Sequence, residues 1–277
     1  YGEDVELVGY DFDYWMGESS GVQYTGTRLE TGADLTLYAH WTPKEYTVTF
    51  VVAGGTMSET TFKVTYRQNY VLPTPESDLV TKAFSGWYTA PGNEGIQYTD
   101  YTGTGQSVWL DAKDMTLYAH WVDVFEFFET EQSIGGGQSI KGYSVKKGEG
   151  IDYVTEVTIP AEYNELPVID ISGGAFDRCT NLKKISIPDT IKNIDYGSSG
   201  GKSTGSPFSN CYNLMDVEVY EVYPGEVYEK RYTSIDGALF EYRDKENMSE
   251  LQLNYISYAR TGRYDIPYGV TAVSYTH

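Results

Sequence analysis

The hexapeptide TLYAHW occupies residues 36–41 and recurs unchanged at residues 116–121, an offset of 80 in a chain of 277 residues. A second matching pair lies upstream, with GVQYT at residues 21–25 and GIQYT at residues 95–99. Self-similarity at a nearly fixed offset is the signature of repeated structural units. The chain is therefore expected to hold one complete repeat, preceded in residues 1–41 by the back half of an earlier copy.

Within the complete repeat, at about residues 45–121, apolar side chains alternate with Thr or Lys. The segments YTVTF at residues 46–50 and FKVTY at residues 62–66 have the period of two that indicates strands. Between them AGGT at residues 53–56 predicts a hairpin connection. Each repeat is thus expected to be a small sheet around an aromatic core, with core residues at matched repeat positions: Trp41, Trp87, Leu117 and Trp121.

A different spacing begins after the three glycines at residues 135–137. Apolar residues now recur as L-x-x-L-x-L, and the block AFxxCxNL at residues 175–182 corresponds to PFxxCxNL at residues 207–214. The offset of 32 residues predicts the coils of a solenoid that stack their apolar faces. The segments that carry the spacing are residues 154–160, 182–188, 214–219 and 264–267.

Both halves resemble known families. The strings YTVTF, AGGT, FSGWYT and TLYAHW resemble the Listeria–Bacteroides repeat, also called the internalin B-repeat. The strings VTIP, GGAFDRCTNLKKISIPDTIKNI and PFSNCYNLMDVEV resemble the BspA-like leucine-rich repeats of bacterial surface proteins. The second pattern is interrupted at the Gly/Ser-rich residues 197–206 and over residues 236–261. The resemblance implies a secreted or wall-attached bacterial protein that acts in adhesion or host-protein binding, and it does not imply an enzyme.

The expected fold class is mainly β, with β-grasp-like small sheet repeats followed by a short leucine-rich-repeat solenoid. Four segments are expected along the chain. They are the C-terminal half of a Listeria–Bacteroides-type repeat (residues 1–44), a complete repeat of that type (residues 45–122), a linker or solenoid cap (residues 123–150), and BspA-like leucine-rich repeats (residues 151–277).

The composition narrows the range of partners. Forty acidic against twenty basic side chains give a formal net charge of −20, which would repel a phosphate backbone, so no nucleic acid is expected. No stretch approaches the roughly 18 apolar residues of a membrane span, so no membrane insertion is expected either. The chain begins at Tyr1 without a basic, apolar leader, which predicts a processed protein or a fragment. An extracellular or cell-surface location is expected, with signal and anchor outside this chain.

The residues that could carry chemistry favour a structural interpretation. His40 and His120 occupy the same position of two repeats and have no second metal ligand at short spacing, so packing or surface roles are expected. Cys179 and Cys211 also share a repeat position. Neighbouring coils would permit a disulfide between them, but buried thiols are the preferred interpretation. Residues 197–203 lack the spacing of a phosphate-binding loop. No catalytic residue, metal or cofactor is therefore expected.

The outward positions of the L-x-x-L-x-L segments give the candidate partner-binding residues, since solenoid strands present a continuous surface. Tyrosines at residues 220–232 are candidates to extend this surface, because a rigid ring with a polar hydroxyl suits interfaces. The preferred interpretation is that these rings pack on the solenoid or replace other strand-forming residues. The candidate site residues are Glu156, Lys184, Ser186, Asp216, Glu218, Tyr220, Tyr223 and Tyr228.

The function expected from these features is non-enzymatic adhesion or partner recognition at a bacterial cell surface through the repeat surfaces, with an extracellular or host protein as the partner. Two alternatives stay open. The repeats could be a structural spacer of a larger surface protein. They could also be a carbohydrate-binding module in which aromatic side chains stack on a glycan.

Overall fold

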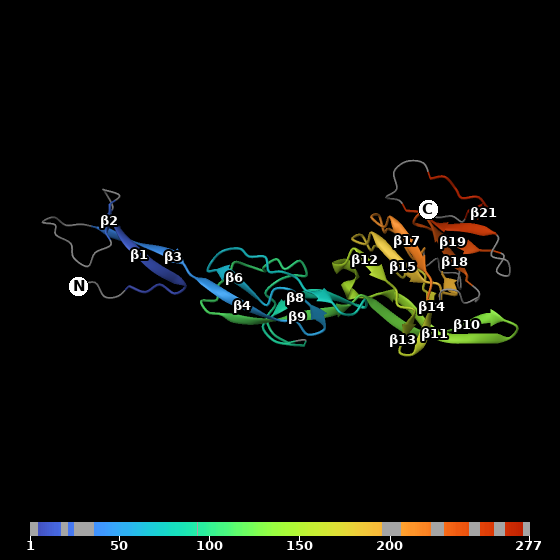
Figure 1. Cartoon of the computed structure of the whole chain (residues 1–277), viewed down its shortest axis with the longest axis horizontal. Coiled ribbons are helices and arrows are strands. Elements are labelled where there is room, and N and C mark those ends of the chain that lie inside the picture. Colours follow the sequence, from blue (N-terminus) through green and yellow to red (C-terminus); the bar gives the residue numbers. More distant parts are fainter. Residues whose placement is uncertain are drawn as a thin grey trace. The chain divides into compact units, whose positions relative to one another are not determined.

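The computed structural model describes residues 5–17, 22–24, 36–92, 94–195, 206–222, 230–243, 250–257 and 264–273. Those residues form strands and turns, with one 3-10 helix, η1 (Glu149–Tyr153), among them (Figure 1). The expectation of a mainly β protein is therefore confirmed. The chain divides into two compact units, Tyr1–Glu76 with Ser85–His120 and Ser77–Phe84 with Trp121–His277.

The first sheet holds the earlier of the two hexapeptides. Strand β1 (Tyr10–Gly17) lies between β2 (Gln23–Tyr24) and β3 (Leu37–Pro43), and both pairings are antiparallel. Phe12 pairs with Trp41 and Trp15 with Ala39. Because directly opposed residues of an antiparallel pair project to the same side, these aromatic side chains share one face of the sheet.

The second sheet holds the complete repeat and has the strand order β6-β4-β9-β8. Its strands are β4 (Glu45–Val51), β6 (Thr61–Thr65), β8 (Lys82–Tyr88) and β9 (Met115–Asp123). Strand β4 pairs antiparallel with β6 and parallel with β9, so the two segments of alternating sequence are adjacent strands. The short strands β5 (Gly55–Thr56) and β7 (Glu76–Ser77) form a separate two-stranded sheet.

The alternation of the sequence correctly places most of the core of the complete repeat. Val48, Trp87 and Leu117 are fully buried, and the ring of Phe50 lies 4.5 Å from that of Trp87. Trp109 is also buried and donates its indole hydrogen to the Asp111 carbonyl at 2.7 Å, a core residue that no repeat correspondence revealed.

Two of the expected core tryptophans are only half-buried, so the prediction was wrong for them. Trp41 meets Phe12 edge to face at 5.5 Å, and Trp121 meets Phe84 in the same way at 5.9 Å. An edge-to-face neighbour covers only part of a ring, which leaves the rest of the indole accessible.

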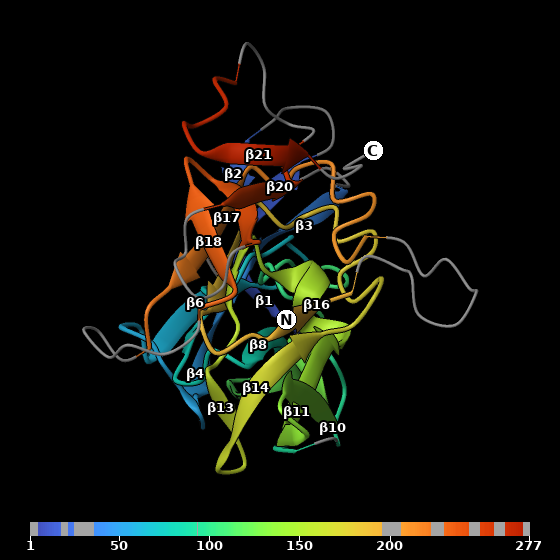
Figure 2. The same cartoon turned by 90° about the vertical axis from the view of Figure 1, so that its right-hand side faces the viewer.

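The second unit begins with a long hairpin. Residues 123–150, expected as a linker or cap, hold β10 (Phe125–Gly135) and β11 (Gln138–Lys147), which pair antiparallel. Strand β11 runs parallel to β14 (Leu166–Ile171), as Figure 2 shows, and β14 continues the sheet to β13 (Glu162–Tyr163) and β16 (Asn193–Ile194).

A buried carboxylate joins four strands of this sheet. The side chain of Asp170, on β14, accepts hydrogen bonds from Asn193 Nδ2 at 2.7 Å, Gln132 Nε2 at 3.2 Å and Ser144 Oγ at 2.5 Å. Ser144 is also within 2.6 Å of the hydroxyl of Ser172. Because polar partners surround this carboxylate, its burial is compensated.

Three of the four L-x-x-L-x-L segments form a parallel sheet, β12 (Glu156–Thr158), β15 (Lys184–Pro188) and β17 (Asp216–Tyr220). For the fourth segment, residues 264–267, the prediction was wrong, because it forms no strand and Ile266 is 54% exposed. Residues that match at the 32-residue offset also make equivalent hydrogen bonds. Asn181 donates to the Asp152 carbonyl at 2.6 Å, and Asn213 donates to the Thr180 carbonyl at 2.7 Å. Matched sequence positions therefore make matched contacts to the chain segment that precedes them.

A last sheet follows with the order β18-β19-β20-β21. Its strands are β18 (Tyr232–Ile235), β19 (Ala238–Tyr242), β20 (Leu251–Tyr255) and β21 (Val270–Val273), antiparallel except for the β20–β21 pair. Strands β19 and β20 lie within residues 236–261, where the leucine-rich-repeat pattern of the sequence is interrupted.

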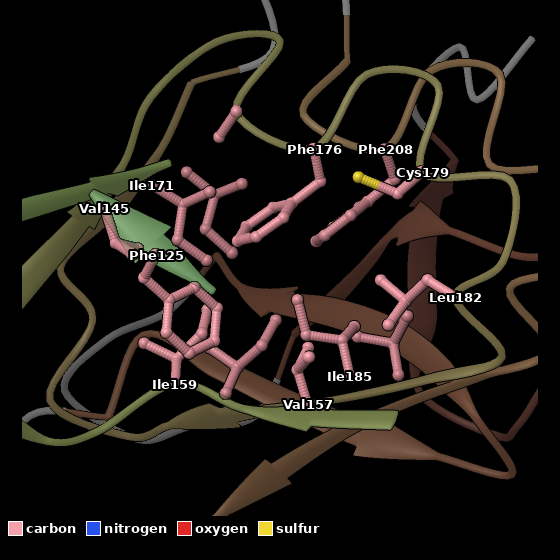
Figure 3. Close-up of a cluster of buried hydrophobic side chains, with 14 of the residues drawn as sticks. Phe125, Val145, Val157, Ile159, Ile171, Phe176, Cys179, Leu182, Ile185 and Phe208 are labelled. Atoms are coloured by element: carbon pink, nitrogen blue, oxygen red, sulfur yellow. The ribbon is translucent and has the colours of Figure 1, made fainter. Parts of the chain in front are cut away.

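The core of the second unit lies between strands β12 and β15 on one side and the turns that carry Phe176 and Phe208 on the other (Figure 3). Phe176 and Phe208, from matched positions, stack with centroids 6.0 Å apart and are fully buried. Val157, Ile185 and Val217 occupy one row across the three parallel strands and point into this core. Repeated apolar residues thus form continuous columns, which fixes the register of the strands.

Candidate recognition site

The outward side chains of β12, β15 and β17 form two rows across the parallel sheet. One row is Glu156, Lys184 and Asp216, and the other is Thr158, Ser186 and Glu218. Side chains alternate between the two faces of a strand, so residues on either side of a buried one must project the other way. Of the predicted site residues, five are thereby brought onto one face: Glu156, Lys184, Ser186, Asp216 and Glu218.

Lys184 is the cation at the centre of this face, which we call the acidic face. Its Nζ lies 2.6 Å from Glu218 Oε2 and 3.7 Å from Asp216 Oδ2. The hydrogen bond to Glu218 raises the pKa of Lys184, with further contributions from the charges of Glu218, Asp216 and Glu156. The same hydrogen bond lowers the pKa of Glu218, to which Ser186 Oγ also donates at 3.3 Å.

The acidic face keeps an excess of negative charge. Three carboxylates, on Glu156, Asp216 and Glu218, surround the single ammonium group of Lys184, which leaves 1 − 3 = −2. At physiological ionic strength dissolved salt screens exposed charges from one another beyond about 8 Å, so these carboxylates attract a cation mainly at short range. The face is therefore suited to binding basic groups that approach it directly.

Tyr220 lies at the end of this face and is half-buried, not fully exposed. Its hydroxyl donates to the Ile159 carbonyl at 2.7 Å, and burial together with the nearby Asp189 raises its pKa to about 12. Tyr232, grouped with it in the expected tyrosine cluster, is buried, and its hydroxyl accepts the Ile194 amide at 3.0 Å. For Tyr232 the packing alternative is correct. Tyr223 and Tyr228 lie outside the described residues.

Beside Tyr220 lies an ionic group that the sequence did not reveal. Asp189 is buried, and its Oδ1 accepts the Val222 amide at 3.1 Å. Lys230 Nζ lies 3.8 Å from Asp189 Oδ2 and forms an ion pair with Glu221. Lys230 is 41 residues from Asp189 in sequence, so no local spacing could have indicated this pair.

Each of the two repeat histidines stacks on a tyrosine, although His40 is exposed and His120 is buried. His40 stacks on Tyr14 with centroids 4.6 Å apart, and its Nδ1 lies 2.9 Å from Asp13 Oδ2. His120 stacks on Tyr88 at 3.9 Å. Both rings are held by an aromatic neighbour, as expected for packing roles. Among the described residues, no group of His, Cys, Asp and Glu side chains could hold a metal ion.

Cys179 and Cys211 are both buried free thiols. The Cys211 thiol donates to the Phe176 carbonyl at 2.9 Å. Hydrogen bonding to Cys211, followed by burial, raises the pKa of Cys179, so its thiol stays protonated at neutral pH. The buried-thiol interpretation agrees with this arrangement. The rejected phosphate-loop sequence, residues 197–203, lies outside the described residues.

Searched across the described part of the chain, the structure has no helix with the length and apolar character that a bilayer crossing requires.

Comparison with known proteins identifies relatives of part of the chain. The family model of the Listeria-Bacteroides repeat domain matches residues 3–40 and 46–120, which confirms that resemblance. Internalin H of Listeria monocytogenes serovar 1/2a (strain ATCC BAA-679 / EGD-e) is 34% identical over 120 residues, 41% of this chain. The chain spans about a fifth of that relative, 19% of its length. A solved structure, the T. pallidum leucine rich repeat protein TpLRR, matches 36% of this chain and 48% of its own, with 19% identity and a TM-score of 0.24.

Proposed function

We propose that this chain is part of a bacterial cell-surface repeat protein and that it recognises an extracellular partner protein without catalysis. The observation that carries the proposal is the acidic face, where three carboxylates on neighbouring parallel strands surround Lys184. Such a face offers several charged acceptors at fixed separations. It suits a folded partner that presents Lys or Arg side chains.

The matched repeat and the similarity to internalin H support a surface location. The sheet order β6-β4-β9-β8, with β4 parallel to β9, supports a β-grasp-like fold for the complete repeat. The stacked strands β12, β15 and β17 and the matched Asn181 and Asn213 support a short solenoid of the BspA-like type. We retain the four-segment division at residues 1–44, 45–122, 123–150 and 151–277 as part of this proposal.

The acidic face determines how binding should depend on salt and charge. A basic partner would associate faster at low ionic strength, because exposed charges steer the encounter until salt screens them. Tyr220, at the end of the acidic face, would contact the partner through the accessible part of its ring, since its hydroxyl is already hydrogen-bonded to the Ile159 carbonyl. Tyr223 and Tyr228 stay candidates on sequence grounds alone.

The experiment has two stages. The purified chain is first screened against a panel of extracellular proteins and a glycan array. A protein hit is then titrated with two variants that change the net charge equally, Asp216→Asn with Glu218→Gln, and Glu126→Gln with Glu129→Gln on β10. The second pair of substitutions is a matched control, because Glu126 also forms an ion pair with a lysine: its Oε2 lies 3.0 Å from Lys146 Nζ.

We expect the first variant to lose at least tenfold in affinity and most of its salt dependence, and the control to keep both. Equal losses in the two variants would mean that only overall charge matters, which contradicts a site on the acidic face. Binding to glycans alone would favour the carbohydrate-binding alternative. No binding in either screen would favour a structural spacer.

A further inference from the structure

The two cysteine-bearing segments of the second unit lie side by side. Phe176 donates its amide hydrogen to the Pro207 carbonyl at 2.8 Å, and Arg178 donates to the Ser209 carbonyl at 2.8 Å. Backbones joined by such successive bonds lie about 4.7–4.9 Å apart, as neighbouring strands do. The rings of Phe176 and Phe208 stack beside them, so residues at the 32-residue offset lie opposite each other. The two cysteines have the same offset and therefore lie opposite each other as well.

The geometry of the two thiols suits a bond between them. Cys179 and Cys211 are both fully buried. The thiol of Cys211 reaches across to the neighbouring segment, where it donates to the Phe176 carbonyl at 2.9 Å. Disulfides span Cα separations of about 4.4–6.8 Å, and opposed residues on hydrogen-bonded backbones lie within that range. The sulfurs can therefore join without a large movement of the backbone.

The two sulfurs differ in how easily they lose a proton. A hydrogen bond from the Cys179 thiol lowers the pKa of Cys211, although burial opposes this effect. A backbone hydrogen bond from Cys179 and the charge of Lys147 also lower the pKa of Cys211. For Cys179 the hydrogen bond with Cys211 and burial both raise the pKa. The thiolate therefore forms on Cys211, while Cys179 keeps its proton.

We propose that Cys179 and Cys211 form an oxidation site, at which a small hydroperoxide such as hydrogen peroxide joins them in a disulfide within the folded chain. The size of the oxidant follows from burial. Neither side chain is accessible to solvent, so a bulky disulfide reagent reaches the sulfurs only after the chain has opened. A thiolate beside a second thiol is also the arrangement in which a sulfenic acid condenses to a disulfide. This site uses none of the side chains of the acidic face.

The reaction has two steps. The Cys211 thiolate attacks one oxygen of the peroxide, so that an S–O bond forms, the O–O bond breaks and the departing hydroxide takes up a proton to become water. The sulfur of Cys179 then attacks the sulfenic sulfur of Cys211. An S–S bond forms, the S–O bond breaks, and the departing hydroxide takes the proton of the Cys179 thiol as a second water. Two thiols and one peroxide thus give one disulfide and two waters, and two electrons pass from the sulfurs to the peroxide.

The disulfide would fasten together the segments that lead into β15 and β17, where Lys184 lies opposite Asp216. A cross-link between residues distant in sequence restricts the unfolded chain and so favours the folded state. The oxidised protein should therefore unfold at a temperature several degrees higher than the reduced protein.

The test starts from the full chain in its reduced form, freed of reductant. Hydrogen peroxide should lower the intact mass by two hydrogen atoms, and the number of thiols that react in denaturant should fall from two to none. Dithiothreitol should restore both thiols. Folding should slow the reaction with an aromatic disulfide reagent roughly tenfold more than it slows the reaction with peroxide. These measurements use the unaltered chain, so a misfolded variant cannot produce them.

Two matched variants separate the roles of the sulfurs. Cys179→Ser keeps a hydroxyl donor beside Cys211 and removes the sulfur that resolves the sulfenic acid. Cys211→Ser removes the attacking sulfur. Dimedone, which reacts with sulfenic acids, should label Cys179→Ser after peroxide treatment and should label Cys211→Ser roughly tenfold less. Circular dichroism checks that both variants are folded.

Four outcomes would overturn the proposal. Addition of oxygen atoms without the loss of two hydrogens would show that the sulfurs cannot join. Covalent dimers would mean that the bond forms between chains. Equal slowing of the two reagents by folding would mean that oxidation requires unfolding. Equal dimedone labelling of the two variants would contradict the assignment of Cys211 as the attacking sulfur.

Discussion

Phe50 and Trp87 lie with their ring centroids 4.5 Å apart and their planes tilted by 31°, which joins β4 to β8 through the core of the complete repeat. The two residues are 37 positions apart in the sequence, and both are buried. The contact therefore forms only when the long connection between β6 and β8 has brought the two halves of the repeat together. This contact is part of the buried core of the complete repeat.

We expect Phe50→Ala to lower the free energy of unfolding of the complete repeat by about 3–5 kcal/mol, because it removes a buried ring and leaves a cavity beside Trp87. Phe62→Ala is the control. Phe62 is 36% exposed although the alternation groups it with the buried Val64. Its loss should cost roughly 1 kcal/mol or less.

Urea unfolding followed by tryptophan fluorescence measures both variants, since all five Trp lie at or before residue 121. Similar midpoints for the two variants would contradict the assignment of Phe50 to the core.

Glu218 should titrate at lower pH than an unpaired glutamate, because Lys184 donates to its carboxylate. A lowered pKa in the folded state means that the ion pair contributes stability above the unfolded-state pKa, about 4.3, and loses it as the pH falls through the folded-state value. Carboxyl NMR shifts recorded against pH should show this difference. In Lys184→Met the pKa of Glu218 should return toward its usual range, and an unchanged titration would show that the pair does not form in solution.

Asp170→Ala should destabilise the second unit by about 3 kcal/mol or more, because it leaves the donors of Asn193, Gln132 and Ser144 without their acceptor in a buried place. Asp152→Asn, at an exposed position of η1, serves as the control and should have little effect. Far-ultraviolet circular dichroism against urea compares the two. If the variants unfold alike, the network contributes no net stability.

Cys179 and Cys211 should react slowly with a thiol reagent in the native protein and rapidly once it is unfolded. Both are fully buried, and the raised pKa of Cys179 keeps its thiolate scarce at neutral pH. Absorbance after addition of an aromatic disulfide reagent gives the rate and the number of reacting thiols. Two thiols should appear in denaturant without reductant. None under the same conditions would show that the pair is oxidised to a disulfide.

The sequence by itself determined the main strands of the complete repeat and of the parallel sheet, and the direction of most of their side chains. Alternation placed Val48 and Leu117 in a core, and the L-x-x-L-x-L spacing placed Ile185 and Val217 inward. It follows that Lys184 and Glu218 must project outward. These predictions succeed because the period of a strand is a local property of the backbone, and burial of apolar side chains selects one face of it.

Only the tertiary structure decided how much of each surface is covered. Trp15 and Trp87 are equivalent in sequence, yet Trp15 is half-buried and Trp87 is fully buried. Phe50 of β4 packs against Trp87, whereas no described strand lies in the corresponding place beside Trp15. The same holds for Tyr220 and Tyr232 and for the pairing of Asp189 with Lys230, which depend on partners distant in the chain. Burial and ion pairing are properties of what packs against a residue, and no local pattern encodes the identity of that neighbour.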